Sequence, residues 1–272
     1  MLEYDFMQNA FIASGIVALV AGVAGFFLVL RGQTFAGHAL SHVGFAGATG
    51  AVLLGLPPLW GLILVTLLGG ITMGAMEARL QGSDIAIGTV LSLALGLGML
   101  FLHFFTAYAT QATALLFGNV LGVSSDILWT LAALGALCLL ALAAISRPLV
   151  FASLQPELAE AKGVSLRMVS ILFLAIVALA TAECIQIVGV LLVFTLTVGP
   201  AATAQKLTTH LARGVLLSAI LALAEAWLGI AMAYYTDWPS SFWITTFSAT
   251  AYLLVAARDK LPGLPRPAIA PR

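Results

Sequence analysis

Two histidines at helical spacing are the residues of this chain whose types and positions could do chemistry. His38 and His42 lie in the segment GHALSHVGFAG, four positions apart. That spacing places both imidazoles on one face of a helix, about one turn apart, where they could chelate one divalent ion. They make only half of a zinc site, because zinc prefers four ligands. The rest must come from other helices, from water or from a second subunit. The structural alternative is an ordinary hydrogen bond between helices for each histidine.

The rest of the chain is too apolar for a soluble protein. Of its 272 residues, 62% are apolar and 8% are charged, whereas soluble domains carry about 25% charged residues. This composition indicates an integral membrane protein, and with about 20 residues per span the length allows about eight to ten spans. Counted from Arg31, His42 lies about 16 Å along the helix axis, below the interface. A polar side chain at that depth normally faces protein or a water-filled path.

Apolar runs separated by Gly, Pro or charged residues predict an all-α, polytopic membrane helix bundle of 8–9 transmembrane helices. The sixth and seventh runs meet at ECIQIVG almost without a loop, so the count is eight or nine. The second run carries the histidines, and its small residues Gly37, Gly44 and Ala48 predict close packing in the centre of the bundle. The predicted spans are 10–30, 36–54, 59–77, 84–104, 125–146, 168–185, 187–205, 212–235 and 242–257.

The basic residues predict how the chain crosses the membrane. All 11 Lys and Arg fall at alternate connections, which places the amino terminus outside and the carboxyl terminus in the cytoplasm. Glu3 and Asp5 precede the first apolar run, where a signal peptide would be basic, so we expect that run to remain as the first span. The prediction is one transmembrane domain over residues 1–260 and a Pro-rich cytoplasmic tail over 261–272.

The connection at 147–167 is predicted to be the only long cytoplasmic one. Its segment PELAEAKG begins with proline and stops at glycine. Its glutamates stand towards the positive, N-terminal end of the helix dipole and its lysine towards the negative, C-terminal end. This is a helix of about two turns, too short to span a bilayer. It either joins two spans on the surface or docks a cytoplasmic partner. The residues concerned are Pro156, Glu157, Glu160, Lys162 and Gly163.

Three acidic residues are candidates for additional metal ligands. Glu183 is expected at the outer corner between the sixth and seventh spans, and Glu225 midway along the eighth. Either could also accept a proton, while the structural alternative is a satisfied contact between helices. Asp237, in the outer segment TDWPSS, could equally be a turn or cap residue. His103 stands beside Phe104 near the end of its span, which favours anchoring at the interface.

No motif for enzymatic chemistry accompanies these residues. The sequence contains no GxxxxGK[ST] phosphate loop, no HExxH and no GxSxG, which argues against ATP hydrolysis by this chain and against the common hydrolases. Cys138 and Cys184 lie in apolar runs without CxxC spacing. They are therefore predicted to be packing residues without a disulfide or metal role.

Five stretches, in order, resemble the membrane permease subunits of bacterial ABC importers for divalent zinc, manganese and iron, the ABC-3 type metal permeases. Together they cover residues 10 to about 257. They are LRGQTFAGHALSHVGFAG, SDIAIGTVLSLALGLGML, LLFGNVLGVS, PELAEAKGVS and VGVLLVFTLTVGPAATA.

The resemblance implies a permease subunit of an ATP-driven importer in the bacterial plasma membrane. It implies a homodimer or a pair of permeases around one central path. A cytoplasmic ABC ATPase dimer would hold the ATP and dock at 156–163, and an extracytoplasmic metal-binding protein would deliver metal to the outer mouth. The chain itself would be no enzyme and would hold no permanent cofactor, only the transported metal. Nucleic acid is not an expected partner.

The resemblance also assigns a role to the histidines. In the family an Asp is followed four residues on by a His, and both line the metal path. His42 matches the His, and His38 stands at the Asp position. Imidazole in place of carboxylate shifts preference from manganese towards later transition metals, so zinc is favoured, with manganese or iron as alternatives. Phe45 and Phe117 are candidates, by position, for sealing the path.

Two other functions compete with this one. A secondary transporter could use Glu183 or Glu225 to carry protons, and its uptake would collapse with the proton gradient. An intramembrane hydrolase could use His38 and His42 to hold a catalytic metal-bound water, and it would need no partner chain. The short cytoplasmic helix and the lack of intramembrane charge pairs favour the importer.

Overall fold

The computed structural model describes residues 3–77, 83–104, 116–118 and 120–258, and every regular element within those ranges is helical. The predicted all-α class is therefore confirmed. The elements are α1 (Asp5–Leu30), α2 (Thr34–Leu53), α3 (Pro58–Glu77), α4 (Ser83–His103), η1 (Val120–Gly122), α6 (Ser125–Leu154), α7 (Pro156–Ala161), α8 (Leu166–Val188), α9 (Val190–Leu207), α10 (Leu211–Thr236) and α11 (Ser240–Arg258).

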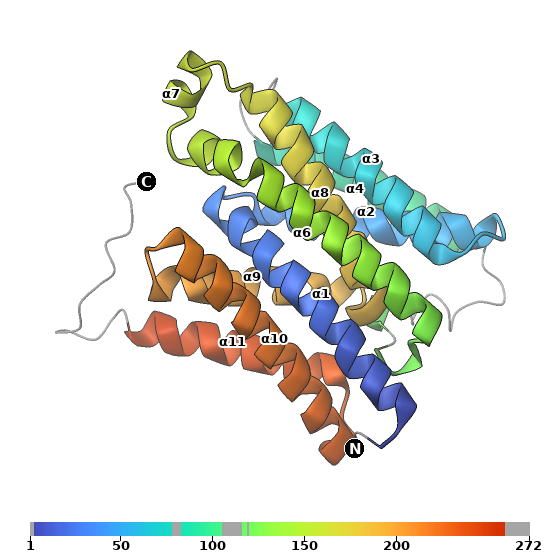
Figure 1. Ribbon diagram of the computed structural model, residues 1–272. Coiled ribbons are helices and arrows are strands. Elements are labelled where there is room, and N and C mark those ends of the chain that lie inside the picture. Colours follow the sequence, from blue (N-terminus) through green and yellow to red (C-terminus); the bar gives the residue numbers. More distant parts are fainter. Residues whose placement is uncertain (1–2, 78–82, 105–115, 119, 259–272) are drawn as a thin grey trace.

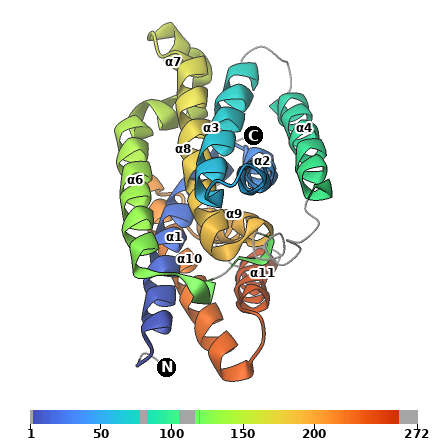
Figure 2. The ribbon, with the colours of Figure 1, turned by 90° about the vertical axis from the view of Figure 1, so that its right-hand side faces the viewer.

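In the described part of the chain, eight helices are long and apolar enough to cross a membrane, and α2 is not one of them. Helix α2 has 20 residues, but its glycines, histidines and hydroxyl residues make it less apolar than the others. It packs against α3, α4, α8 and α9, and Figure 2 shows it end-on among them. Within the described residues, the prediction of eight or nine is therefore met by eight apolar helices, with α2 as a further helix packed among them.

Glycines allow the close packing around α2, as predicted. Gly47 of α2 and Gly61 of α3 lie so close that a Cβ atom on either would overlap the carbonyl of the other. A Cβ on Gly44 would lie within 2.5 Å of Ile185 from α8 and 3.0 Å of Thr66 from α3. Small residues at these positions let two helix backbones approach to contact distance, which fixes the rotation of α2 about its axis.

The expected tight corner between α8 and α9 consists of one residue, Gly189, with φ of 77°. Glycine adopts this backbone conformation without the penalty that a Cβ atom imposes. The corner lies later than predicted, because α8 continues to Val188. Glu183 and Gln186 are therefore inside a helix and not at the corner.

Helix α6 also ends later than the sequence predicts. The sequence predicts its end at 146, before Arg147 and Pro148, yet the helix continues to Leu154. Its 30 residues correspond to about 45 Å at 1.5 Å per residue, more than the roughly 30 Å of hydrocarbon in a bilayer. Arg147 is exposed and so does not end the helix. The predicted long connection at 147–167 shrinks to residues 155–165 around α7.

The two ends of the bundle carry different features. Figures 1 and 2 place α7 at one end, while the start of α1 and the connection from α10 to α11 lie at the other. Which end faces the cytoplasm remains a prediction from the basic residues, with α7 inside. Arg79 and the predicted tail at 261–272 lie outside the described residues. Cys138 and Cys184 are buried and free, and they pack in the core as predicted.

Candidate metal site

The two imidazoles of α2 lie against each other at the side of the helix that faces α9. The ring centroids of His38 and His42 are 4.9 Å apart, with the ring planes at 81°. The ring of His38 also contacts the edge of Phe194 from α9, at 5.4 Å between centroids. Both histidines are half-buried in the single protomer, and Phe194 is 37% exposed. The pair therefore lies at an accessible edge of an otherwise buried helix.

Among the described residues, the imidazole pair belongs to no larger group of side chains that could bind a metal. Across residues 3–77, 83–104, 116–118 and 120–258, no group of three or more His, Cys, Asp or Glu side chains could hold a metal ion. A catalytic zinc centre usually has three protein ligands with an open fourth position, so this pair does not favour the hydrolase alternative. The structure places the two imidazoles together at a half-buried position, and the metal half-site that the sequence predicts stays a prediction.

Glu183, a candidate additional ligand, lies in a different interface. Its side chain is fully buried, and neither carboxyl oxygen has a hydrogen-bond partner among the described residues. It faces Gly135 of α6, where a Cβ atom would lie 3.1 Å from Oε1 of Glu183. Val20 and Ile16 of α1 line the same space. The carboxyl group thus sits between α1, α6 and α8, and the protomer does not bring it to the histidines.

Glu225 is the second buried carboxyl group. It lies on α10, which packs against α1, α9 and α11, and it is 4% exposed. The side chain of Ser248 from α11 interacts with its carboxyl group, although neither oxygen forms a regular hydrogen bond within the described chain. The structure does not group Glu225 with the imidazole pair. A carboxyl group inside a membrane span usually contacts a neighbouring helix or lines a transport path.

Asp237, the third acidic candidate, has a clear structural role. It ends α10 in the left-handed conformation, with φ of 56°, and its N–H donates to the carbonyl of Ala233 at 3.0 Å. Aspartate tolerates this conformation better than most residues. The sequence left open whether Asp237 is a turn or cap residue. The structure shows that it caps the C-terminal end of α10 through its backbone N–H.

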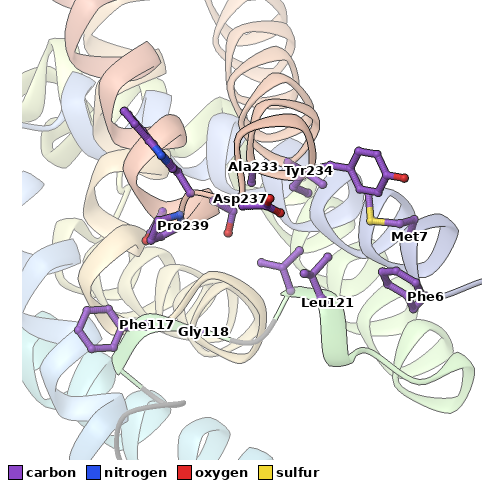
Figure 3. Close-up of a pocket in the computed structure, with 14 residues that line it drawn as sticks. Phe6, Met7, Phe117, Gly118, Leu121, Ala233, Tyr234, Asp237 and Pro239 are labelled. Carbon is purple, nitrogen blue, oxygen red and sulfur yellow. The ribbon is translucent and has the colours of Figure 1, made fainter. Parts of the chain in front are cut away.

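Asp237 also borders a pocket of about 1020 Å³ at the end of the bundle opposite α7. Figure 3 shows Asp237 above Leu121, with Phe117 and Gly118 on one side and Phe6 and Met7 of α1 on the other. The structure thus brings Asp237 and Phe117 to one pocket. Asp237 is the only Asp or Glu among the lining residues.

The aromatic residues predicted to seal a path lie in different surroundings. Phe45 follows His42 by almost one turn of α2 and is buried, facing α4 at Gly98. Phe117 is 57% exposed at the pocket opposite α7. His103 is the last residue of α4 and packs on Phe104 at 5.5 Å between ring centroids, an arrangement that fits interface anchoring.

Helix α7 forms as the sequence predicts, with Pro156 at its first position and Gly163 at φ of 84° just beyond it. Ala159 is fully buried, whereas Glu157, Glu160 and Lys162 are exposed. Sequence reasoning missed Leu158, which is 47% exposed beside the glutamates. An exposed leucine on a short polar helix was the available signal.

The described chain is a bundle of apolar helices in which the histidine-bearing helix α2 packs among α3, α4, α8 and α9, with a short helix, α7, beyond one end, an arrangement that suits a multi-pass membrane protein. The chain belongs to the ABC 3 transport family, whose model matches residues 3–259. This confirms the resemblance seen in the five sequence stretches. The chain is a multi-pass protein of the bacterial inner membrane.

Named relatives cover nearly the whole chain. The manganese transport system membrane protein MntC of Halalkalibacterium halodurans is 30% identical over 256 residues, 93% of this chain and 87% of the relative. The manganese import system permease protein ScaB of Streptococcus parasanguinis is 30% identical over 253 residues, 93% of this chain and 90% of the relative. The solved structure of PsaBC from Streptococcus pneumoniae in complex with Fab matches with a TM-score of 0.83, at 29% identity over 93% of this chain and 92% of that one.

Proposed function

We propose that this chain is the permease subunit of an ATP-driven importer for a divalent transition metal, with His38 and His42 as its metal ligands. The observation that carries the proposal is the imidazole pair on the enclosed helix α2, with its ring centroids 4.9 Å apart and an accessible edge beside α9. Relatives at 30% identity are named manganese transport or import permeases, which supports a metal as the cargo.

A second permease copy would complete the site. One protomer offers two imidazoles and no third ligand in its described residues. If the partner presents the same edge of α2, the two copies together supply four imidazoles, the number of ligands that zinc prefers. Transport requires that some of these contacts be exchanged for water as the ion moves, so a site divided between two copies suits passage better than storage.

The partners follow from the two ends of the bundle. Helix α7, with its exposed leucine and glutamates, would dock the cytoplasmic ABC ATPase dimer that holds the ATP. The pocket at the opposite end would face the extracytoplasmic metal-binding protein. The permease itself would carry out no chemical step and would bind no permanent cofactor.

The source of energy for transport distinguishes the proposed ATP-driven importer from its alternative, a proton-coupled secondary transporter. The two buried carboxyl groups inside the spans, Glu183 and Glu225, are the observation that favours a proton-coupled secondary transporter. We expect metal uptake by the chain, reconstituted with its ATPase and binding protein, to require ATP and to be unaffected by a protonophore. Uptake of radioactive manganese and zinc into vesicles measures this. Uptake without ATP that collapses with the proton gradient would establish the alternative instead.

The choice of metal should depend on His38. Relatives of this chain are named for manganese, whereas imidazole in place of the family's carboxylate favours zinc or another later transition metal. We expect His38→Asp to shift the ratio of manganese to zinc uptake towards manganese by about tenfold, because a hard oxygen ligand replaces nitrogen. Competition between the two metals in the same vesicles measures the ratio, with His103→Asp as the control. An unaltered ratio would reject zinc preference through His38.

A further inference from the structure

Arg31 joins three separate segments at the α7 end of the bundle. It is the C-cap residue of α1. Its Nη2 donates to the Ser170 hydroxyl of α8 at 2.7 Å, and its Nη1 donates to the Ser153 hydroxyl of α6 at 3.3 Å. Its Nε donates to Oε1 of Gln33 at 3.0 Å. The guanidinium also lies over the ring of Phe173, 5.5 Å from the centroid.

Two of these contacts hold the two stems of α7. Ser153 stands in the last turn of α6, three residues before α7 begins, and Ser170 stands in the second turn of α8, nine residues after α7 ends. Ala159 of α7 is fully buried against the same core. A force that displaces α7 therefore moves one or both stems, and with them the hydroxyl groups that hold Arg31.

The third contact leads to the helix that carries the histidines. Gln33 is the N-cap residue of α2, 5% exposed, and its N–H donates to the carbonyl of Leu28 at 2.9 Å. His38 follows Gln33 by five residues, less than two helical turns. The turn between α1 and α2 is thus held to the guanidinium of Arg31 by the side chain of Gln33 and by the short covalent connection between the two residues.

We propose that Arg31 is a positioning residue that transmits displacement of α7 to α2 and so links the ATPase cycle to the metal path. The inference rests on the proposed function, and it adds a residue to it. The planar guanidinium suits this role because its donors point in fixed directions, so a shift of one acceptor turns the whole group. Helix α3 packs against both α8 and α2 and offers a second route. Loss of Arg31 therefore weakens coupling without abolishing it.

The test compares transport with ATP consumption in vesicles holding the permease, its ATPase and its binding protein. We expect Arg31→Gln to lower the number of metal ions imported per ATP by about tenfold, a usual size for coupling between sites. The rate of ATP hydrolysis should stay near wild type, and the ATPase should still co-purify with the variant permease. Arg213→Gln, at an exposed basic position of α10, is the matched control and should leave the ratio unchanged. An unchanged ratio in Arg31→Gln would overturn the inference.

A second variant covers the case in which Arg31→Gln does not assemble. Ser153→Ala with Ser170→Ala removes both acceptors and leaves the charge in place, so it should reproduce the lowered ratio. Adding Arg31→Lys to the double serine variant should lower the number of metal ions imported per ATP little further, since the bonds to both stems are already lost. Normal coupling in the double serine variant would refute the role of Arg31. If the wild-type complex imports no metal with ATP, the proposed function fails and not this inference.

Discussion

His42→Ala should reduce metal uptake by about 100-fold or more, because removing even an outer partner of a metal ligand typically costs 10- to 100-fold in affinity. His42 matches the family's ligand position, and its ring lies beside that of His38 with its edge accessible from outside the protomer. Loss of its imidazole leaves one ligand per copy. Initial rates of ATP-driven uptake of radioactive manganese and zinc measure the effect.

Substitution of another histidine provides the control for His42→Ala. His103→Ala removes a histidine from the end of α4, outside the imidazole pair, and should leave uptake near wild type. Both variants must appear in the membrane at wild-type levels, since Gly44 and its neighbours pack tightly near His42. Wild-type uptake by a correctly inserted His42→Ala variant would remove His42 from the metal path.

Charge reversal on α7 should have the second largest effect. Replacing both Glu157 and Glu160 by lysine should weaken ATPase binding about 100-fold, because like charges placed against each other at an interface cost several kcal/mol. Both side chains are exposed while Ala159 anchors the helix in the core, so the change alters the docking surface and spares the fold. Co-purification of the ATPase and ATP consumed per metal ion imported measure the loss.

Leu158→Ala is a milder companion on the same surface. It removes an exposed apolar side chain without a change of charge, and it should weaken docking less than the double reversal does. Arg213→Glu, a charge reversal at an exposed position of α10, serves as the control. If both α7 variants retain the ATPase and normal coupling, α7 is only a connection between two spans.

Sequence patterns predicted the local structure of this protein well. Apolar runs locate the spans because a backbone in lipid must satisfy its own hydrogen bonds, which only a helix does within one segment. The spacing of His38 and His42 placed both rings on one face, since i and i+4 always share a face. The proline and glycine around α7 gave its start and end, because each acts on the backbone of its own neighbourhood.

The ends of the helices were less predictable from the sequence than their positions. The apolar run predicts the end of α6 at 146, yet the helix continues to Leu154 with Pro148 inside it and Arg147 exposed. Glu183 was expected at a corner and lies inside α8, because Gly189 makes the turn instead.

The sequence by itself determined the membrane class, the family, the imidazole pair and the short helix that projects from the bundle. Each of these features depends on residues that are close together in the sequence. The sequence also predicted the close packing of α2, but only the tertiary structure decided which helices surround it and that Glu183 and Glu225 lie in interfaces apart from the histidines. It also joined Arg31 to serines 122 and 139 positions away. The physical reason is that packing sets the rotation of each helix about its axis, and that rotation decides which side chains meet.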